Sequence, residues 1–588
     1  MHETIVGCFF ATATRRGTRD ALRHKEGGAW RSISWADYAE RVRRAARGLI
    51  GLGLEPGEAV VIMAHNRWEW LVSSLAVMAA GGVPASIYPT STREQATYIA
   101  RHCGAKIAIV EDAVTAAKLD EAAFRLGQRV FMDGQGDGRG AQSFTSLLSL
   151  GEGVAQAELD ARMEALRPDA LATLIYTSGT TGEPKGVMLS NDNLVFAARA
   201  TIEAFRAGDE EELISYLPLS HIAEQLMSIH IPAVLGVTVS IAESLEKLGE
   251  DLRDVRPTIF FAVPRVWEKF EARIREATAK APRWRRALAR AAGRVGLRAS
   301  RPGASAVLRP VGWGLAERLV FRKVRARLGL DRCHVAVSGA APLGRATQDF
   351  FLALGIPILE TYGLTESTGP VVLSTKDAWR LGTTGVAIPG SEIRIAPDDG
   401  EILVRGRHVF MGYLGDEQAT REAKDAHGWL HTGDIGEMDE RGFLRITDRK
   451  KDLIVTAGAK NVAPQRIEAM LKTIPGVLQA AVVGDRRKFL AALLTLDPDA
   501  SLRIARERGL AASSTVELAA HPGFQAYVRE AIDAVNRDLA RYETIKRFHL
   551  LARELTVESG ELTPTLKIKR KVVAMRYGAE IEAMYHGD

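Results

Sequence analysis

Cysteine is scarce in this chain, and its scarcity excludes several classes of protein. Only three cysteines occur among 588 residues, Cys8, Cys103 and Cys333, far apart and without CxxC spacing. A disulfide framework or a cysteine-rich metal site is therefore not expected, and a reducing compartment is the natural interpretation. The N-terminal residues include a short apolar stretch with no basic residues ahead of it, so they do not resemble a secretory signal. We expect a cytoplasmic protein.

Uninterrupted apolar runs are also lacking. Residues 70–92 carry no charge and are long enough to cross a bilayer, for which about 20 apolar residues suffice. Gly81, Gly82, Pro84 and Pro89 interrupt this run, which predicts a buried helix, a glycine turn and a short strand in a soluble protein. Low-complexity tails and internal repeats are absent as well. With 46% hydrophobic residues, the chain is long enough for several domains with their own cores.

Basic residues are in excess, and part of the excess is concentrated. The formal net charge is +6, and residues 281–313 hold eight arginines and no acidic residue. The first half of this arginine-rich insertion could be a basic amphipathic helix that contacts the inner face of an anionic membrane peripherally. The alternative, given equal weight, is a solvated insertion packed by Trp284 and Leu288. Few aromatic residues are interleaved for stacking on bases, so no nucleic-acid partner is expected.

Helical and strand-like segments alternate along much of the chain, which is typical of parallel sheets covered by helices. We expect a helix over residues 36–52, a turn and buried strand over 52–63, and further strands at 106–110, 170–176, 258–263 and 334–337. Residues 134–140 are most simply a surface loop. Residues 382–443 are rich in glycine and short β-like runs, which predicts a small antiparallel subdomain. A domain boundary lies near Asp448, and the residues after it have mixed α and β character.

One segment is suited to binding phosphate. Residues 176–186, YTSGTTGEPKG, follow the apolar strand-like LATLIY. Glycines let backbone N–H groups approach phosphate oxygens, hydroxyl groups donate further hydrogen bonds, and Lys185 supplies positive charge. The segment is not a Walker loop, because GxxxxGK[ST] is absent, and no HExxH zinc signature occurs in the chain. The length of the run and its strand-like flank distinguish it from an ordinary flexible loop.

This segment resembles the signature loop of the acyl-adenylate-forming (AMP-binding) superfamily. Further motifs of the superfamily follow in order, so the resemblance covers nearly the whole chain: YLPLSHIAEQ (216–225), SGAAP (338–342), ETYGLTE (360–366), WLHTGD (429–434), ITDRKKD (446–452), TAGAKNV (456–462) and LTPTLKIKR (562–570). The most similar branch is the bubblegum-type long-chain fatty acyl-CoA synthetases. The resemblance implies an α/β fold with a large N-terminal domain, residues 1–447, of helix-covered mixed and parallel sheets plus the small β subdomain. A smaller, mobile α+β C-terminal domain, residues 448–588, would turn on a hinge at Asp448.

The resemblance also implies roles for individual residues. Tyr362 would stack on adenine, Thr365 would touch the α-phosphate, and Asp434 would accept hydrogen bonds from the ribose hydroxyls. The implied catalytic residues are Lys567, Glu366, Thr177, Lys185 and His221, with Glu366 and Thr177 also holding Mg²⁺. The implied cofactor-binding residues are Thr177, Ser178, Gly179, Thr180, Thr181, Gly182, Lys185, Gly339, Ala340, Ala341, Glu360, Thr361, Tyr362, Gly363, Thr365, Asp434, Ile446, Arg449, Gly458 and Lys567.

Two of these positions depart from the usual pattern of the superfamily. Gly458 is followed by Ala459 where many relatives have a second glycine, in the turn that would line the pantetheine channel. Leu566 stands where a glycine usually precedes the catalytic lysine, so Lys569 remains the alternative to Lys567. The alternative for both lysines is that they simply belong to a basic tail on the surface.

The implied reaction joins a fatty acid to coenzyme A with ATP and Mg²⁺, through an acyl-adenylate. Phe260, Phe261, Val263 and Trp267 could line an apolar acyl tunnel, although such aromatic spacing is more often simply core. One rival is a fatty acyl-AMP ligase that loads a carrier protein, but we find no insertion of the kind that obstructs transfer to CoA. The rival from another class is a catalytically silent lipid-binding or membrane scaffold. Chain length preference and oligomeric state are not predicted.

Overall fold

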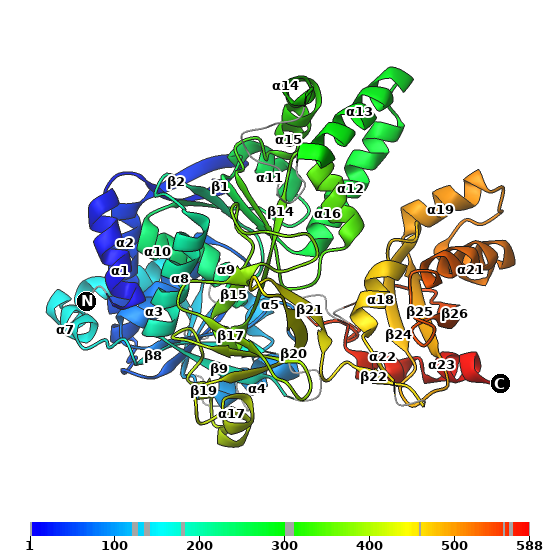
Figure 1. Cartoon of the computed structure of the whole chain (residues 1–588). Helices are drawn as coiled ribbons and strands as arrows, with labels where there is room; N and C mark the ends of the chain where they lie inside the picture. The colour runs from blue at the N-terminus through cyan, green and yellow to red at the C-terminus, as the bar shows by residue number, and fades with distance from the viewer. Residues whose placement is uncertain are drawn as a thin grey trace.

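The structure is a computed structural model of the whole chain, in which two regions follow one another (Figure 1). It describes residues 3–119, 127–134, 141–177, 183–299, 311–457, 460–556, 559–563 and 568–586. The predicted loop at residues 134–140 lies outside the described residues beyond Gly134.

An eight-stranded mixed sheet organises the first region. Its order is β19-β9-β8-β4-β3-β5-β6-β7, parallel from β8 to β7 and antiparallel at β9 and β19. The strands are β3 (Ala59–Met63), β4 (Val83–Ser86), β5 (Ile107–Val110), β6 (Gln128–Phe131), β7 (Gln142–Ser143), β8 (Leu171–Thr177), β9 (Lys185–Ser190) and β19 (Gly412–Tyr413). Successive residues of a strand face opposite sides. Val60 and Ile62 of β3 therefore join the core beneath α2 and α3, whereas Val61 and Met63 join the core beneath α4.

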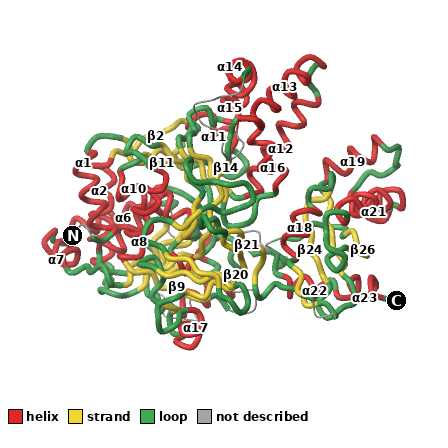
Figure 2. Tube along the Cα trace, in the orientation of Figure 1, coloured by secondary structure: helices red, strands yellow, loops and turns green. Residues whose placement is uncertain are grey.

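Helices pack on both faces of this sheet, since its strands contribute to two separate cores. Figure 2 shows the helices of the first region around its strands. They are α1 (Ile5–Arg16), α2 (Trp35–Gly51), α3 (Trp68–Ala79), α4 (Arg93–His102), α5 (Ala113–Ala116), α6 (Phe144–Leu150), α7 (Gln156–Glu164), α8 (Asn191–Phe205), α9 (Ile222–Gln225) and α10 (Ile231–Leu235). Ser34 caps α2 by accepting a hydrogen bond from the Asp37 amide. The predicted helix over 36–52 is thus confirmed, as is the interpretation of residues 70–92 as a buried helix, a turn and the short strand β4.

Two further sheets complete the α/β part. One has the order β10-β11-β1-β2, from β1 (Asp20–Glu26), β2 (Ala29–Ser34), β10 (Glu212–Ser215) and β11 (Thr238–Ile241). The other has the order β12-β13-β14-β15-β16, from β12 (Ile259–Ala262), β13 (Val335–Ser338), β14 (Ile358–Leu364), β15 (Gly369–Leu373) and β16 (Val386–Ala387). Strands β12, β13 and β14 are parallel, so their carboxyl ends share one edge, where ligands commonly bind in open α/β sheets.

A helical projection is attached to the β12–β16 sheet. It consists of α11 (Leu248–Val255), α12 (Pro264–Ala279), α13 (Arg283–Ala299), α14 (Trp313–Ala316), α15 (Arg322–Leu328) and α16 (Arg345–Ala353). Phe260 of β12 packs against Trp267 of α12, which in turn packs edge-on against Phe351 of α16. Phe260 and Trp267 are both fully buried in this contact. They therefore belong to the core, the alternative that sequence reasoning preferred over a tunnel lining.

A small antiparallel sheet follows, as predicted from the glycine-rich segment. Its order is β17-β18-β20-β21, from β17 (Glu392–Ile395), β18 (Glu401–Arg405), β20 (Leu430–Met438) and β21 (Leu444–Arg449). The short helix α17 (Glu417–Ala423) lies beside it in the chain. Residue 448, the predicted hinge, is inside β21 and pairs with Ile435.

The last region has cores of its own. Strands β24 (Val477–Val483), β25 (Leu490–Leu496) and β26 (Ile545–Leu550) form a sheet next to α18 (Pro464–Leu471), α19 (Pro498–Glu507), α20 (Thr515–Ala520), α21 (Pro522–Asn536), α22 (Arg570–Arg576) and α23 (Gly578–Tyr585). The pair β22 (Ile454–Val455) and β23 (Asn461–Val462) precedes them. The architecture matches the predicted fold class. Among the described residues, no helix combines the length and apolar character needed to cross a membrane.

Candidate active site

The predicted phosphate loop lies in a hairpin between two central strands. Thr177 ends β8 and Lys185 begins β9, and the two residues are direct partners in the antiparallel ladder. Residues 178–184 join them, and residues 178–182 lie outside the described residues. Gly186 also faces the ring of Tyr176 closely, since a Cβ at Gly186 would lie 3.1 Å from Tyr176 Cζ. The hairpin therefore fixes both ends of the loop.

A chain of contacts links Lys185 to Glu366 through an aromatic residue. The ammonium of Lys185 lies 4.9 Å from the centroid of the Tyr413 ring and 3.6 Å from Asp416 Oδ2. The hydroxyl of Tyr413 donates a 2.8 Å hydrogen bond to Glu366 Oε1. Burial and the Glu366 carboxylate both raise the pKa of Tyr413, so this hydroxyl stays protonated and remains a donor. Tyr413 thus contacts both a cation and a carboxylate of the candidate site.

A second chain of contacts joins three other predicted residues. The hydroxyl of Tyr362 on β14 donates a 2.7 Å hydrogen bond to Asp434 Oδ2, and Arg449 Nε lies 3.0 Å from Asp434 Oδ1. Asp434 is 3% exposed and pairs with Arg449 across β20 and β21. Burial disfavours the charge on Arg449, but Asp434 and other carboxylates, Glu366 among them, raise its pKa. The carboxylate of Asp434 is therefore held in place, and each of its oxygens keeps a further lone pair for a ligand.

The shared edge of β13 and β14 brings the adenine-binding candidates together. Gly339 lies so close to β14 that a Cβ there would be 2.6 Å from Thr361 Cγ2. Ala340 has a φ of +67°, a left-handed conformation that residues other than glycine seldom adopt. Burial raises the pKa of Glu360 to about 7, although hydrogen bonds from Gln348 and the Leu343 amide oppose this. The remaining candidates on this edge are Ala341, directly after Ala340, and Gly363, whose Cβ would collide with the Gly369 carbonyl oxygen at 1.9 Å.

Three other candidates occupy more ordinary positions. Thr365 and Glu366 share a single 3₁₀ turn, where the Thr365 carbonyl accepts from the Thr368 amide. Ile446 is half-buried on β21 and packs against the main core. The Nδ1 atom of His221 accepts a hydrogen bond from the Ala223 amide at 3.2 Å, which makes His221 the N-cap of α9. Gly458 and Lys567 lie outside the described residues.

The predicted hinge residue is buried beside charged groups of the last region. Asp448 is 3% exposed, its Oδ2 has no hydrogen-bond partner among the described residues, and burial raises its pKa to about 7. Arg570 at the start of α22 is the cation that opposes this shift. The same guanidinium binds Glu468 of α18 through two contacts, of 2.6 and 2.8 Å. The segment after the predicted catalytic lysine is therefore attached to α18, next to β21.

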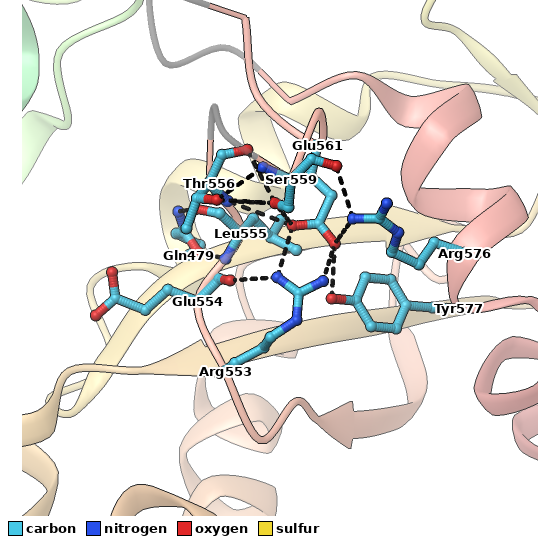
Figure 3. A network of polar contacts seen from close by, with 9 residues as sticks. All are labelled: Gln479, Arg553, Glu554, Leu555, Thr556, Ser559, Glu561, Arg576 and Tyr577. Carbon is cyan, nitrogen blue, oxygen red and sulfur yellow. Dashed lines mark hydrogen bonds and ion pairs between the residues drawn. The ribbon is translucent and has the colours of Figure 1, made fainter.

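A second polar network holds the chain on the other side of Lys567 (Figure 3). The carboxylate of Glu561 is fully buried and accepts hydrogen bonds from Arg553, Ser559, Arg576 and Tyr577. Burial opposes ionisation, but these donors outweigh it and lower the pKa of Glu561 to about 2. The Glu561 carbonyl accepts from the Lys569 amide at 2.8 Å, and Leu562 pairs with Ile568. The chain is therefore held on both sides of residues 564–567, which lie outside the described residues.

Sequence reasoning missed Tyr413, Glu561 and Arg570. The signal for Tyr413 was weak, since Gly412-Tyr413 forms a strand of only two residues. Glu561 and Arg570 stand in the quoted C-terminal motif or beside it, but nothing in the sequence shows which partners they meet. The described residues contain no group of three or more His, Cys, Asp or Glu side chains placed to hold a metal. An apolar cavity of about 10 Å³, bordered by Phe205, Met227 and Ile259, is too small for an acyl chain.

Comparison with known proteins is consistent with these features. A family model described as AMP-binding enzyme matches residues 9–414, and a model of the AMP-binding enzyme C-terminal domain matches residues 451–588. Long-chain-fatty-acid–CoA ligase ACSBG2 of Xenopus laevis is 37% identical over 617 residues, covering 99% of this chain and 84% of the relative. Long-chain-fatty-acid–CoA ligase FadD15 of Mycobacterium tuberculosis is 40% identical over 571 residues, covering 95% and 93%.

Solved structures share the fold at lower identity. ATP-bound MatB from Rhodopseudomonas palustris has a TM-score of 0.73 at 23% identity, covering 98% of this chain and 99% of MatB. The adenylation domain of a carboxylate reductase from Mycobacterium chelonae has a TM-score of 0.76 at 22% identity, covering 99% and 91%. The chain therefore belongs to the AMP-binding enzyme superfamily, as a homologue of the long-chain fatty acid–CoA ligases of the ACSBG, or bubblegum, branch.

Proposed function

We propose that this protein is an ATP-dependent long-chain fatty acid–CoA ligase that forms an acyl-adenylate and then an acyl-CoA. The observation that carries the proposal is a pair of contact groups, Lys185–Tyr413–Glu366 and Tyr362–Asp434–Arg449, which the electrostatic effect of Glu366 on Arg449 links. The preference for a long acyl chain is supported by the names of the curated relatives. The apolar cavity described above is too small to hold such a chain.

The two groups of contacts suit the two ends of ATP. The carboxylate of Asp434, held by Tyr362 and Arg449, would accept hydrogen bonds from vicinal hydroxyl groups of ribose. Lys185 and the backbone N–H groups of the loop after Thr177 would contact the phosphates. The small residues Gly339 and Ala340 would leave room for the adenine ring, with Tyr362 alongside it.

The residues present fit a magnesium ion. Mg²⁺ usually binds one or two carboxylates together with phosphate oxygens and waters, rather than a cage made only of protein. Glu366 offers one carboxylate, oriented by the Tyr413 hydroxyl, and the Thr177 hydroxyl stands opposite Lys185 across the hairpin. When bound with ATP, the ion would neutralise charge on the phosphates.

The first half-reaction brings two anions together. An oxygen of the fatty carboxylate attacks the α-phosphorus of ATP, the new O–P bond forms, and the bond to the β-phosphate breaks to release pyrophosphate. Positioning and charge neutralisation are the main requirements, because no covalent enzyme intermediate is needed. Lys185 and Lys567 would provide positive charge, and the Glu561 network holds the described residues on either side of the segment that contains Lys567.

The second half-reaction transfers the acyl group. The sulfur of CoA attacks the acyl carbon, the C–S bond forms, and the C–O bond to AMP breaks, so that AMP leaves with the electron pair. The segment 455–457 would border the pantetheine arm. Its Val455 carbonyl accepts from the Arg486 amide and its Ala457 amide donates to the Arg487 carbonyl, so two arginines flank it. Their charge suits the phosphates of CoA.

The deciding experiment measures AMP and acyl-CoA formed from ATP, Mg²⁺ and a panel of carboxylic acids, with and without CoA. The expected result is CoA-dependent turnover that peaks with long-chain acids. Accumulation of acyl-AMP without thioester would instead identify a ligase that loads a carrier protein. Absence of both products with every acid would contradict catalysis and favour the scaffold.

A further inference from the structure

Residues 281–327, the part of the chain that includes α13, α14 and most of α15, account for the net positive charge of this protein. This segment has thirteen lysines and arginines and one acidic residue, a net charge of +12. Because the whole chain carries +6, the remaining residues together carry −6. The basic character of the molecule is thus a local property of one segment, and neither half-reaction proposed above uses it.

Packing determines which face of α13 points outward. A Cβ at Gly296 would lie 2.3 Å from the Ala353 carbonyl oxygen, so this face of α13 is pressed against the end of α16. Ala292, one turn earlier, is buried in a small core with Ala316, Val320 and Phe321. Arginines follow one another at intervals of three or four residues on the other face and are all exposed: Arg283, Arg286, Arg290, Arg294 and Arg298. They form an arginine ridge on a firmly anchored helix.

Carboxylates on the neighbouring helices do not neutralise this ridge. Among the described residues, no ion pair involves any of the five arginines, whereas acidic side chains nearby have other partners. These pairs are Glu271–Arg275, Glu276–Lys280, Glu317–Arg325 and Asp349–Arg345. Five unpaired cations in one row repel one another in water, so an anionic surface that binds them would lower their energy.

Apolar side chains are exposed on the same projection. Of the fourteen large hydrophobic residues exposed in the described chain, five lie in this segment: Trp284, Leu297, Val311, Leu315 and Leu319. Trp284, which sequence reasoning considered as packing for the insertion, is 63% exposed at the start of α13, whereas Leu288 packs against the core of the projection. Figure 1 shows α13 and α14 at the end of the projection, away from the strands of the candidate site.

We propose that the arginine ridge of α13, with the exposed apolar residues beside it, docks on an anionic phospholipid surface. Arginines near such a surface gain electrostatic energy from lipid phosphates, and a tryptophan favours the interface between headgroups and acyl chains. A nucleic acid would match the charge but would give no favourable environment to Leu315 or Val311. The apolar face of α13 is occupied by α16 and by residues 316–321, so the helix rests on the headgroups instead of inserting. This contact stands independently of the proposed reaction.

The test compares two triple variants of the full chain that lose the same charge. Arg286→Gln, Arg290→Gln and Arg294→Gln shorten the ridge, while Arg421→Gln, Arg441→Gln and Arg445→Gln remove exposed arginines of α17 and the β20–β21 region. Co-sedimentation is measured with vesicles of phosphatidylcholine alone and of phosphatidylcholine mixed with phosphatidylglycerol. The wild type and the control should bind the mixed vesicles, and the ridge variant should bind at least about tenfold more weakly.

Raising the salt concentration provides a second measurement that needs no variant. Binding of the wild type to the mixed vesicles should fall between about 0.1 and 0.5 M salt, because screening shortens the reach of the arginines. Equal binding to neutral and anionic vesicles, equal losses in both triple variants, or tighter binding to duplex DNA than to vesicles at the same salt would each overturn the proposal. Thioester formation from fatty acid in solution, measured in parallel, reports on the proposed reaction separately.

Discussion

Tyr413 is the residue through which the cation and the carboxylate of the candidate site meet. Its ring lies under Lys185 and its hydroxyl donates to Glu366. Tyr413→Phe keeps the ring and removes only the hydroxyl, so the contact with Lys185 is retained while Glu366 loses its donor. We expect the apparent KM for Mg²⁺-ATP to rise about tenfold or more, the usual value of a hydrogen bond to a charged group. Pyrophosphate release at varied Mg²⁺-ATP is the measurement, and an unchanged KM would contradict this role.

Lys567 and Lys569 can be distinguished by their effects on the separate half-reactions. The Lys569 amide donates a hydrogen bond to the Glu561 carbonyl, whereas Lys567 lies outside the described residues. Lys567→Ala should lower adenylation by about 100-fold or more, since a positive charge aimed at a reacting phosphate is lost. Thioester formation from supplied acyl-AMP should be largely retained. The opposite result, normal adenylation in Lys567→Ala and loss in Lys569→Ala, would shift the motif alignment by two residues.

Glu224 makes stability depend on pH in a way that exposed carboxylates do not. Glu224 is 2% exposed, and burial raises its pKa from 4.5 to about 7 in the folded state. Between these pH values the unfolded chain binds fewer protons than the folded one, so the free energy of unfolding falls as pH rises. The loss is complete above pH 7 and amounts to about 3 kcal/mol at most.

Glu224→Gln removes this ionisation and keeps the size of the side chain. Its Tm relative to wild type should therefore be higher at pH 8 than at pH 5, by scanning calorimetry. Glu203→Gln, on the exposed surface of α8, is the control and should show the same relative Tm at both pH values. If the Glu224→Gln difference is equally independent of pH, the buried carboxyl is not neutral in the fold.

At the scale of the element, the Glu561 network holds the chain on either side of residues 564–567. Glu561→Gln keeps the shape of the side chain but replaces charge-assisted hydrogen bonds from Arg553 and Arg576 with weaker ones. Adenylation should fall about tenfold, because the residues that flank the segment containing Lys567 would be held less firmly. Thioester formation from supplied acyl-AMP should change little, which separates positioning from general instability. Glu543→Gln is the control, since this buried carboxylate pairs with Arg466 of α18 instead.

The same element shows how far sequence alone could go. The C-terminal motifs predicted a catalytic lysine, a hinge and their order in the chain, because the local residue types are enough to recognise these motifs. The partner of Arg570 is Glu468, about 100 positions earlier in the chain. A partner of Glu561 is Arg553, in the turn after β26. Such contacts depend on how strands are arranged in space, which alternation of helices and strands does not specify. The core position of Phe260 and Trp267 was likewise settled only by the packing of α12 and α16 on one face of a sheet.

At the scale of the whole molecule, a rotation of the last region about residue 448 must disturb β21. Asp448 and Arg449 are still paired with β20, and the Lys450 amide continues the ladder by donating to the Gly433 carbonyl at 2.8 Å. A pivot at Asp448 would therefore change the protection of the Arg449 and Lys450 amides, while amides earlier in β21 would keep theirs. Hydrogen–deuterium exchange should be compared with ATP alone and with CoA plus a non-hydrolysable acyl-AMP analogue. Faster exchange confined to residues 449–452 in one of the two states is the expected result. Equal protection in both states would place the pivot outside β21, or show that the two regions keep one arrangement through both half-reactions.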